Sequence, residues 1–273
     1  MMVAITHSSA IATAQSFQYR VSLNQPRSSM LLSTSTPSIS PAPRIQGPTS
    51  QIDPMNSPYP VPWQWVMETF DKVRSTTGTG VRYYRSPSLM SPDGQYAAYS
   101  RIEMHVEAQL YECYVSSVMF VEHLATGDLQ TIMASSPIAT HQMDNPRPYS
   151  FPGAIAILIP VSWNSAGNQL LARQFEALFS TSDMSDYAVI WDQQHKQTYT
   201  LAPHGRNYEY AMLLGWSQTY PGQVLFRAGN LGETSWPLWA VSTSGKTVSA
   251  NQDRPLVFGN TIPKSWEGPQ FHW

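Results

Sequence analysis

Three arginines recur at similar places in the chain and could bind an anionic group. Arg101, Arg173 and Arg227 each follow a short apolar stretch that is typical of the second strand of a hairpin. One guanidinium from each repeat could lie on the same edge of the molecule and bind carboxylates or phosphates. A second interpretation is local pairing, since Glu103 and Glu176 lie close behind two of the arginines. We favour local pairing, because such ion pairs commonly have only a structural role.

Tryptophans in the C-terminal half form a second group of candidate binding residues. Trp216, Trp236 and Trp239 lie close together in the sequence, and their side chains suit stacking on a glycan or a hot spot in a protein interface. Packing inside a β-domain explains them equally well. Exposure of two or more of these rings on one face would favour binding.

The other reactive residues do not form a catalytic or metal-binding motif. The histidines are scattered without metal-ligand spacing, and no Gly-x-Ser-x-Gly element is present. The oxygen-rich stretch 180–186 lacks the glycine and the terminal glutamate of a calcium loop. We therefore expect a protein that is not an enzyme and needs no metal or other cofactor.

The composition limits which classes of partner and which cellular compartments fit the chain. A net charge of −2 and only 12% charged residues argue against a nucleic-acid partner, which calls for a clustered basic face. The single cysteine, Cys113, excludes an intrachain disulfide and favours a reducing, cytoplasmic location. The longest apolar run, 155–161, is far too short to span a bilayer.

Residues 1–60 differ in composition from the rest of the chain. They are rich in Ser, Thr and Pro, and residues 1–52 contain no Asp or Glu. Such a segment buries too little apolar surface to offset the entropy of ordering, so we predict a disordered tail. A plastid transit peptide fits the same composition if the source has plastids. We favour an untargeted tail.

Residues 61–76 predict one amphipathic helix. Trp63, Val66, Met67, Phe70 and Val73 recur at spacings of three and four residues, and Pro62 stands near the first turn. The helix is expected to dock on the domain that follows. A helix that binds a partner is the less favoured interpretation.

From residue 81 onward, short apolar strands alternate with turn residues, and three similar hairpins follow one another. The first spans 89–101 with the turn Ser91-Pro92-Asp93-Gly94, the second spans 161–173, and the third spans 214–227 with a longer turn. Each is followed by a second hairpin of another type. Recurrence of both types in the same order indicates a repeat protein.

This order resembles the TolB-like family of β-propeller repeats, and the strand end Trp191-Asp192 resembles that of a WD repeat. The resemblance implies an all-β fold with three propeller blades, a partial or small β-propeller, over residues 81–250. Residues 251–273 would then be a C-terminal tail. The chain also resembles cyanobacterial proteins, and this second resemblance implies no activity.

Three blades leave two blade faces open to water, because propellers close with about four to eight blades. The helix and the C-terminal tail, with Trp266, Phe271 and Trp273, could cover these faces. Insertions could also complete further strands, or two chains could close a six-bladed ring. We favour the first two solutions over the dimer.

Because blades supply shape rather than reactivity, we expect a non-enzymatic protein-interaction or scaffold module. The alternative is a small-ligand or glycan-binding protein that uses exposed aromatic rings and arginines.

Overall fold

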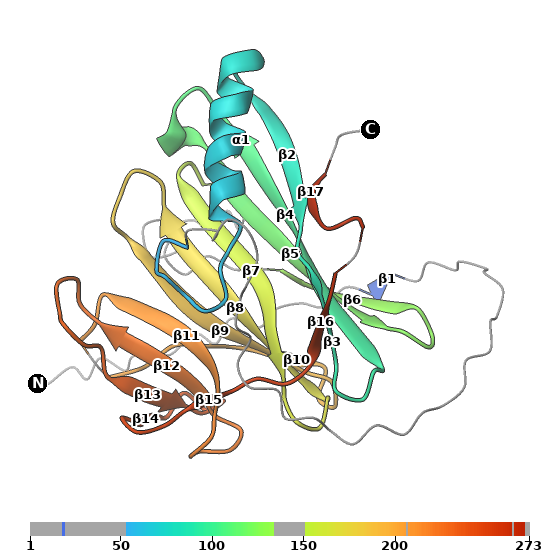
Figure 1. Cartoon of the computed structure of the whole chain (residues 1–273), viewed down its shortest axis with the longest axis vertical. Coiled ribbons are helices and arrows are strands. Elements are labelled where there is room, and N and C mark those ends of the chain that lie inside the picture. The colour runs from blue at the N-terminus through green and yellow to red at the C-terminus, as the bar shows by residue number, and fades with distance from the viewer. Residues whose placement is uncertain (1–17, 20–52, 134–150, 206, 264, 271–273) are drawn as a thin grey trace, which may run out of the picture.

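The computed structural model describes residues 18–19, 53–133, 151–205, 207–263 and 265–270. These residues form β-strands, one α-helix and one 3-10 turn, so the expected all-β class is confirmed (Figure 1). No helix within the described residues is long and apolar enough to cross a membrane.

Three antiparallel meanders of four strands follow one another along the chain. The first meander contains β3 (Ser88–Met90), β4 (Tyr96–Val106), β5 (Tyr114–His123) and β6 (Asp128–Met133). The second contains β7 (Ala154–Trp163), β8 (Gln169–Leu178), β9 (Met184–Asp192) and β10 (Gln197–Leu201). The third contains β11 (Tyr210–Ser217), β12 (Val224–Gly229), β13 (Leu238–Val241) and β14 (Thr247–Ser249). Each of the three expected hairpins opens one meander.

The meanders are not three separate sheets, and within the described residues they do not close a ring. The first two belong to one hydrogen-bonded sheet, because β5 and β7 pair in parallel at Val115 and Ile155. The third lies in its own five-stranded sheet. Strands β4, β5, β7, β8 and β9 are long, with 9 to 11 residues each. The junction lies at the ends of β5 and β7 that are remote from the β3–β4 and β7–β8 turns.

Burial follows the position of each strand between its neighbours. Alternate residues of β4 and β5 are buried, which is the pattern of a sheet with one solvated face. Strands β7, β8 and β9 are buried on both faces. One apolar cluster, around Met119 and Leu158, fills the space between the first and second meanders. Another, around Ile190 and Phe226, fills the space between the second and third.

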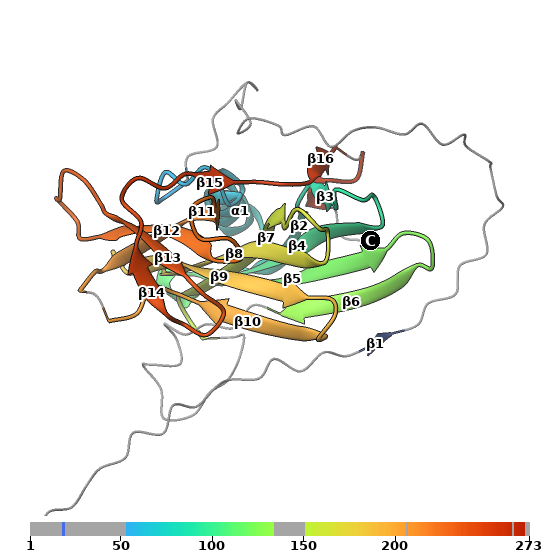
Figure 2. The same ribbon diagram turned by 90° about the horizontal axis from the view of Figure 1, so that it is seen from below.

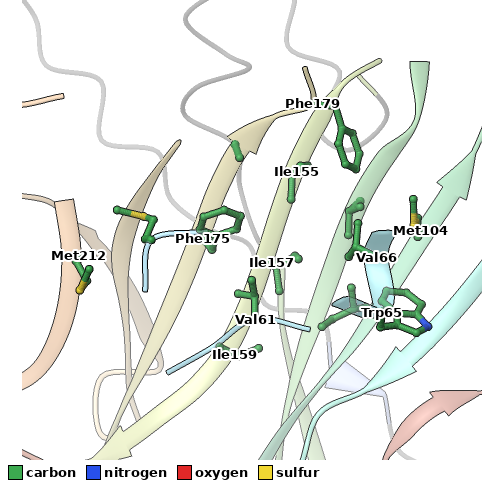
Figure 3. Packing of buried hydrophobic residues seen from close by; sticks show 14 of the residues in the cluster. Val61, Trp65, Val66, Met104, Ile155, Ile157, Ile159, Phe175, Phe179 and Met212 are labelled. Carbon is green, nitrogen blue, oxygen red and sulfur yellow. The ribbon is translucent and has the colours of Figure 1, made fainter. Parts of the chain in front are cut away.

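Helix α1 (Trp63–Thr76) packs on the far halves of the long strands. Figure 3 shows Trp65 and Val66 of the helix beside Met104 and Ile155 of the strands. The buried face differs from the expected stripe, because Trp65 and Thr69 are buried whereas Met67 is only half-buried. The helix ends where Gly78 adopts a φ of 81° and donates its N–H to the Val73 carbonyl at 2.9 Å.

The C-terminal segment crosses all three meanders. Its strands are β15 (Pro255–Leu256), β16 (Asn260–Ile262) and β17 (Gly268–Gln270). Strand β15 pairs with β11, Phe258 bridges to Trp163 of β7, and β16 pairs with β3. Figure 2 shows this red segment running from β15 to β16. The first strand of every meander therefore gains a backbone partner from one continuous piece of chain.

A close crossing lies at Gly259, between the second and first meanders. Its φ is 99°, and a Cβ at this position would lie 2.5 Å from the carbonyl oxygen of Met90. Only glycine fits such a site without a backbone shift. Strand β17 then pairs with β2 (Gly80–Arg85), which pairs with β4 on the same side as β3. Trp266 is 53% exposed, and Phe271 and Trp273 lie outside the described residues, so their expected capping role stays a prediction.

The N-terminal part divides differently from the expectation. Residues 53–60, which composition assigned to the disordered tail, lie in the structure with Asp53 and Met55 buried. Strand β1 (Gln18–Tyr19) pairs with β6. Residues 1–17 and 20–52 lie outside the described residues, so the expected disorder and transit peptide are not tested.

Candidate functional site

The three arginines do not share one edge. Counted from the first residue of each exit strand that pairs across the turn, Arg173 and Arg227 are fourth and Arg101 is fifth. Because side chains alternate between the faces of a strand, this one-residue offset turns Arg101 to the opposite face. The first meander has a fully buried Ser100 at the position that corresponds to Arg173. Arg101 and Arg227 are exposed, and Arg101 lies 5.9 Å from the ring centre of Tyr83.

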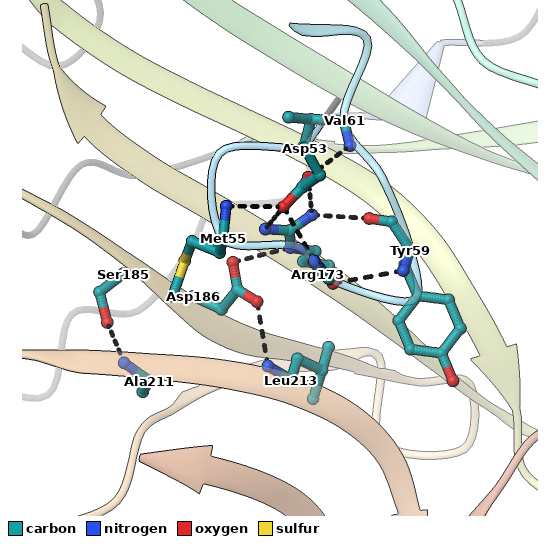
Figure 4. A network of polar contacts seen from close by, with 10 residues as sticks. Asp53, Met55, Tyr59, Val61, Arg173, Ser185, Asp186, Ala211 and Leu213 are labelled. Atoms are coloured by element: carbon teal, nitrogen blue, oxygen red, sulfur yellow. Dashed lines mark hydrogen bonds and ion pairs between the residues drawn. The ribbon is translucent and has the colours of Figure 1, made fainter. Parts of the chain in front are cut away.

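Arg173 is fully buried and forms ion pairs with two aspartates (Figure 4). Its Nη1 donates to Asp53 Oδ2 at 2.6 Å, and its Nε donates to Asp186 Oδ1 at 2.7 Å. A further bond of 2.6 Å reaches the Tyr59 carbonyl. The expected pairing of this arginine with Glu176 is not the one formed, because Glu176 is offset by three residues along β8 and faces the opposite side of the sheet.

The two aspartates extend this ionic network, defined as Arg173, Asp53 and Asp186, to other parts of the chain. Asp53 also accepts backbone N–H groups from Met55, Ser57 and Val61 at 3.0, 3.1 and 3.0 Å. Asp186 accepts the N–H of Leu213 in β11 at 3.0 Å. The network thus joins the N-terminal loop, β8, β9 and the third meander.

Burial and the opposite charges within the ionic network together set the pKa values of its members. Burial opposes the charge of Arg173, but the two carboxylates outweigh it and raise the arginine pKa. Burial also opposes the charge of Asp53, yet Arg173 and the backbone N–H groups lower the pKa of this carboxyl. Complete burial of Asp186 outweighs the attraction of Arg173 and raises its pKa to about 6. The network fixes parts of the fold to one another and occupies the guanidinium of Arg173.

The three candidate tryptophans do not form one exposed face either. Trp216 is 4% exposed and its Nε1 donates to the Trp163 carbonyl at 2.9 Å. Trp236 stacks on Tyr210 with 5.9 Å between ring centres. Trp239 packs against a different apolar cluster from Trp236, on the other face of the sheet. Core packing accounts for the placement of all three.

The structure instead brings other residues together in a cleft between the first and second meanders. It lies where the β5–β6 and β9–β10 turns meet, and its volume is about 710 Å³. We call it the turn cleft. The residues that define it are Tyr96, His123, Asp128 and Gln130 from the first meander, and Trp191, Gln193 and Lys196 from the second.

Aromatic rings form one wall of the turn cleft. Tyr96 packs edge-on against His123 and Trp191, with ring centres 4.8 and 5.9 Å apart. Its hydroxyl accepts a hydrogen bond of 2.5 Å from Gln193 Nε2, which fixes the ring across the two meanders. Burial, followed by the nearby charges of Asp93 and Asp128, raises the pKa of Tyr96, so the phenol stays neutral.

Polar groups complete the lining of the turn cleft. His123 Nδ1 lies 2.9 Å from the Thr126 hydroxyl, which donates to Asp128 Oδ2 at 2.9 Å. The Oε1 atom of Gln130 is buried and has no hydrogen-bond partner within the described residues. A buried acceptor without a donor is costly, so this atom suits an N–H or O–H from a bound group.

Two observations concern metal and thiol chemistry in the described residues. Among the described residues, no group of three or more His, Cys, Asp and Glu side chains is placed to hold a metal ion. Cys113 is buried, and this burial raises the pKa of its thiol, which disfavours the reactive thiolate.

Sequence reasoning missed this site because its residues belong to no motif. A signal was nevertheless present, since the Thr126-Gly127 turn and the turn after Trp191 end the same strand of two successive repeats. Alignment of these closing turns places them at neighbouring corners of the fold.

No family model matches the chain, and neither curated proteins nor solved structures gave a match. Fold and site define an all-β protein with a cleft between successive meanders.

Proposed function

We propose that this chain is a non-enzymatic protein-interaction module, built from three TolB-like propeller repeats, whose partner inserts a side chain into the turn cleft. The repeat assignment draws support from the entry turns. Ser91, Asn164 and Ser217 each donate a backbone N–H across the turn at 2.8 Å, to Tyr96, Gln169 and Gln223 respectively. Turns that differ in sequence therefore share one bonding pattern.

The observation that carries the proposal is the rigid, chemically mixed lining of the turn cleft. Aromatic rings supply apolar contact at low entropic cost, while Gln130, Asp128 and Lys196 offer an acceptor, an anion and a cation. The lining residues come from two meanders that are packed together by a shared apolar cluster. Such preorganisation favours recognition, because little freedom is lost on binding.

A small ligand is the second candidate. The cleft volume of about 710 Å³ falls within the usual range for small-molecule sites. Gln130 Oε1, which has no partner among the described side chains and backbone groups, would accept a hydroxyl, and the Tyr96 and Trp191 rings would contact a sugar ring. A glycan array probed with the full chain tests this candidate directly.

Affinity capture with matched variants tests the protein partner. Lys196→Glu reverses a charge in the turn cleft, and Lys246→Glu makes the same change in the corresponding turn of the third meander. We expect a partner that binds the parent chain and the Lys246→Glu variant but not the Lys196→Glu variant. Equal capture by all three chains would refute a role for the cleft.

A further inference from the structure

Strand β6 is the outer edge of the first meander, and it has a second partner besides β5. Strand β1 (Gln18–Tyr19) pairs with it antiparallel, with Gln18 opposite Gln130 and Tyr19 opposite Leu129. Figure 2 shows β1 beside β6 on the side away from β5. A segment more than thirty residues before the folded domain thus supplies an extra strand to its sheet.

The sequence around β1 is suited to this pairing. Apolar Phe17, Tyr19 and Val21 alternate with polar Gln18, Arg20 and Ser22, which is the pattern of a strand with one buried face. The surrounding Ser/Thr/Pro-rich sequence lacks this pattern. An edge strand such as β6 offers a row of backbone donors and acceptors to any extended segment.

The position of β1 links the edge to the turn cleft. Both of its pairing partners, Leu129 and Gln130, also line the cleft. An extended segment on β6 therefore runs along the rim of the cleft. This is the arrangement of strand-addition sites, in which backbone bonds give affinity and an adjoining pocket gives specificity.

We propose that the N-terminal segment carrying β1 is a docking strand for the β6 edge. It protects this edge from pairing with other chains and lies along the rim of the turn cleft. Docking of β1 on β6 does not depend on the proposed function of the turn cleft.

Hydrogen exchange on the full chain tests the docking. Gln18→Pro/Tyr19→Pro removes both backbone donors of β1, and Ala10→Pro/Ile11→Pro introduces the same residues elsewhere in the N-terminal segment. We expect exchange at Leu129 and Gln130, the two residues of β6 that pair with β1, to be about tenfold faster in the first variant and at the parent rate in the control.

A second arm uses a synthetic peptide of residues 14–24, added to the Gln18→Pro/Tyr19→Pro chain. The peptide is expected to restore slow exchange of β6, whereas a scrambled peptide is not. Equal β6 exchange in parent, variant and control would overturn the proposal, and so would failure of the peptide to restore slow exchange. If partner capture depends on Lys196 but hydrogen exchange of β6 is unchanged by the β1 substitutions, the docking strand is refuted and the proposed function of the cleft stands. The reverse outcome refutes the cleft and leaves the docking strand standing.

Discussion

Replacing Arg173 by methionine is the sharpest test of how the meanders are held together. Methionine has a similar length and no charge, so the change removes the three strongest bonds of the ionic network, of 2.6, 2.7 and 2.6 Å. Two buried carboxylates then remain without their cation. Breaking a buried pair in this way typically costs about 3–5 kcal/mol.

The loss of stability should depend on pH in a defined direction. The pKa of Asp186 is already about 6 with Arg173 present, and it rises further once that attraction is gone. The unfolded carboxyl protonates only near pH ~3.9. Between these values the native variant binds more protons than its unfolded chain, so its stability rises as pH falls. We expect the deficit relative to the parent to be smaller at pH 5 than at pH 8 by about 1–2 kcal/mol.

Urea unfolding followed by tryptophan fluorescence measures both effects, since the chain has nine tryptophans. Arg227→Met is the matched control, because Arg227 occupies the corresponding strand position but is exposed, and its loss should change stability by less than about 0.5 kcal/mol. A deficit for Arg173→Met below about 1 kcal/mol, or one that is the same at both pH values, would refute the reasoning.

Three further perturbations test other parts of the structure. Gly259→Ala forces a Cβ to 2.5 Å from the Met90 carbonyl and should cost about 2–3 kcal/mol in urea unfolding, whereas Gly245→Ala, with positive φ but open space, should cost only about 1 kcal/mol. Gln130→Met removes an acceptor that has no partner in the described part of the chain, so the free energy of unfolding should stay within about 0.5 kcal/mol of the parent while binding to the cleft falls at least tenfold. A clear loss of stability would show that Oε1 is satisfied. Phe70→Ala should cost about 3–5 kcal/mol by emptying the helix–sheet contact, and a change under 1 kcal/mol would contradict docking of α1.

Local pattern made the strands predictable. The hairpins at 89–101 and 161–173 combine alternating or apolar strands with turn glycines, and Gly94 and Gly167 adopt positive φ values of 70° and 75°. The helix was also predictable from the spacing of its apolar residues by three and four positions. These patterns involve residues close in sequence, so they predict local structure without knowledge of the fold.

Long-range features were not predictable for physical reasons. Strand β16 has only three residues and no alternation, so its pairing with β3 leaves no local trace. The loop around Asp53 reads as a Pro-rich linker, and only its distant pairing with Arg173 explains its burial. The prediction that the three arginines share one edge was wrong because Arg101 is offset by one residue from the other two. An alignment of the turns that allows gaps would have revealed this offset.

The C-terminal crossing also sets an order of events for synthesis. Strand β3 gains its second partner only when residues 260–262 are made, and the same holds for the Trp163 end of β7 and for the β15 side of β11. These strand edges therefore stay unpaired until almost the whole domain has left the ribosome. Pairing over so long a sequence separation is slow, and open strand edges invite aggregation meanwhile. Premature stop codons upstream of Pro255 should therefore yield insoluble protein, although every strand of the three meanders has by then been made.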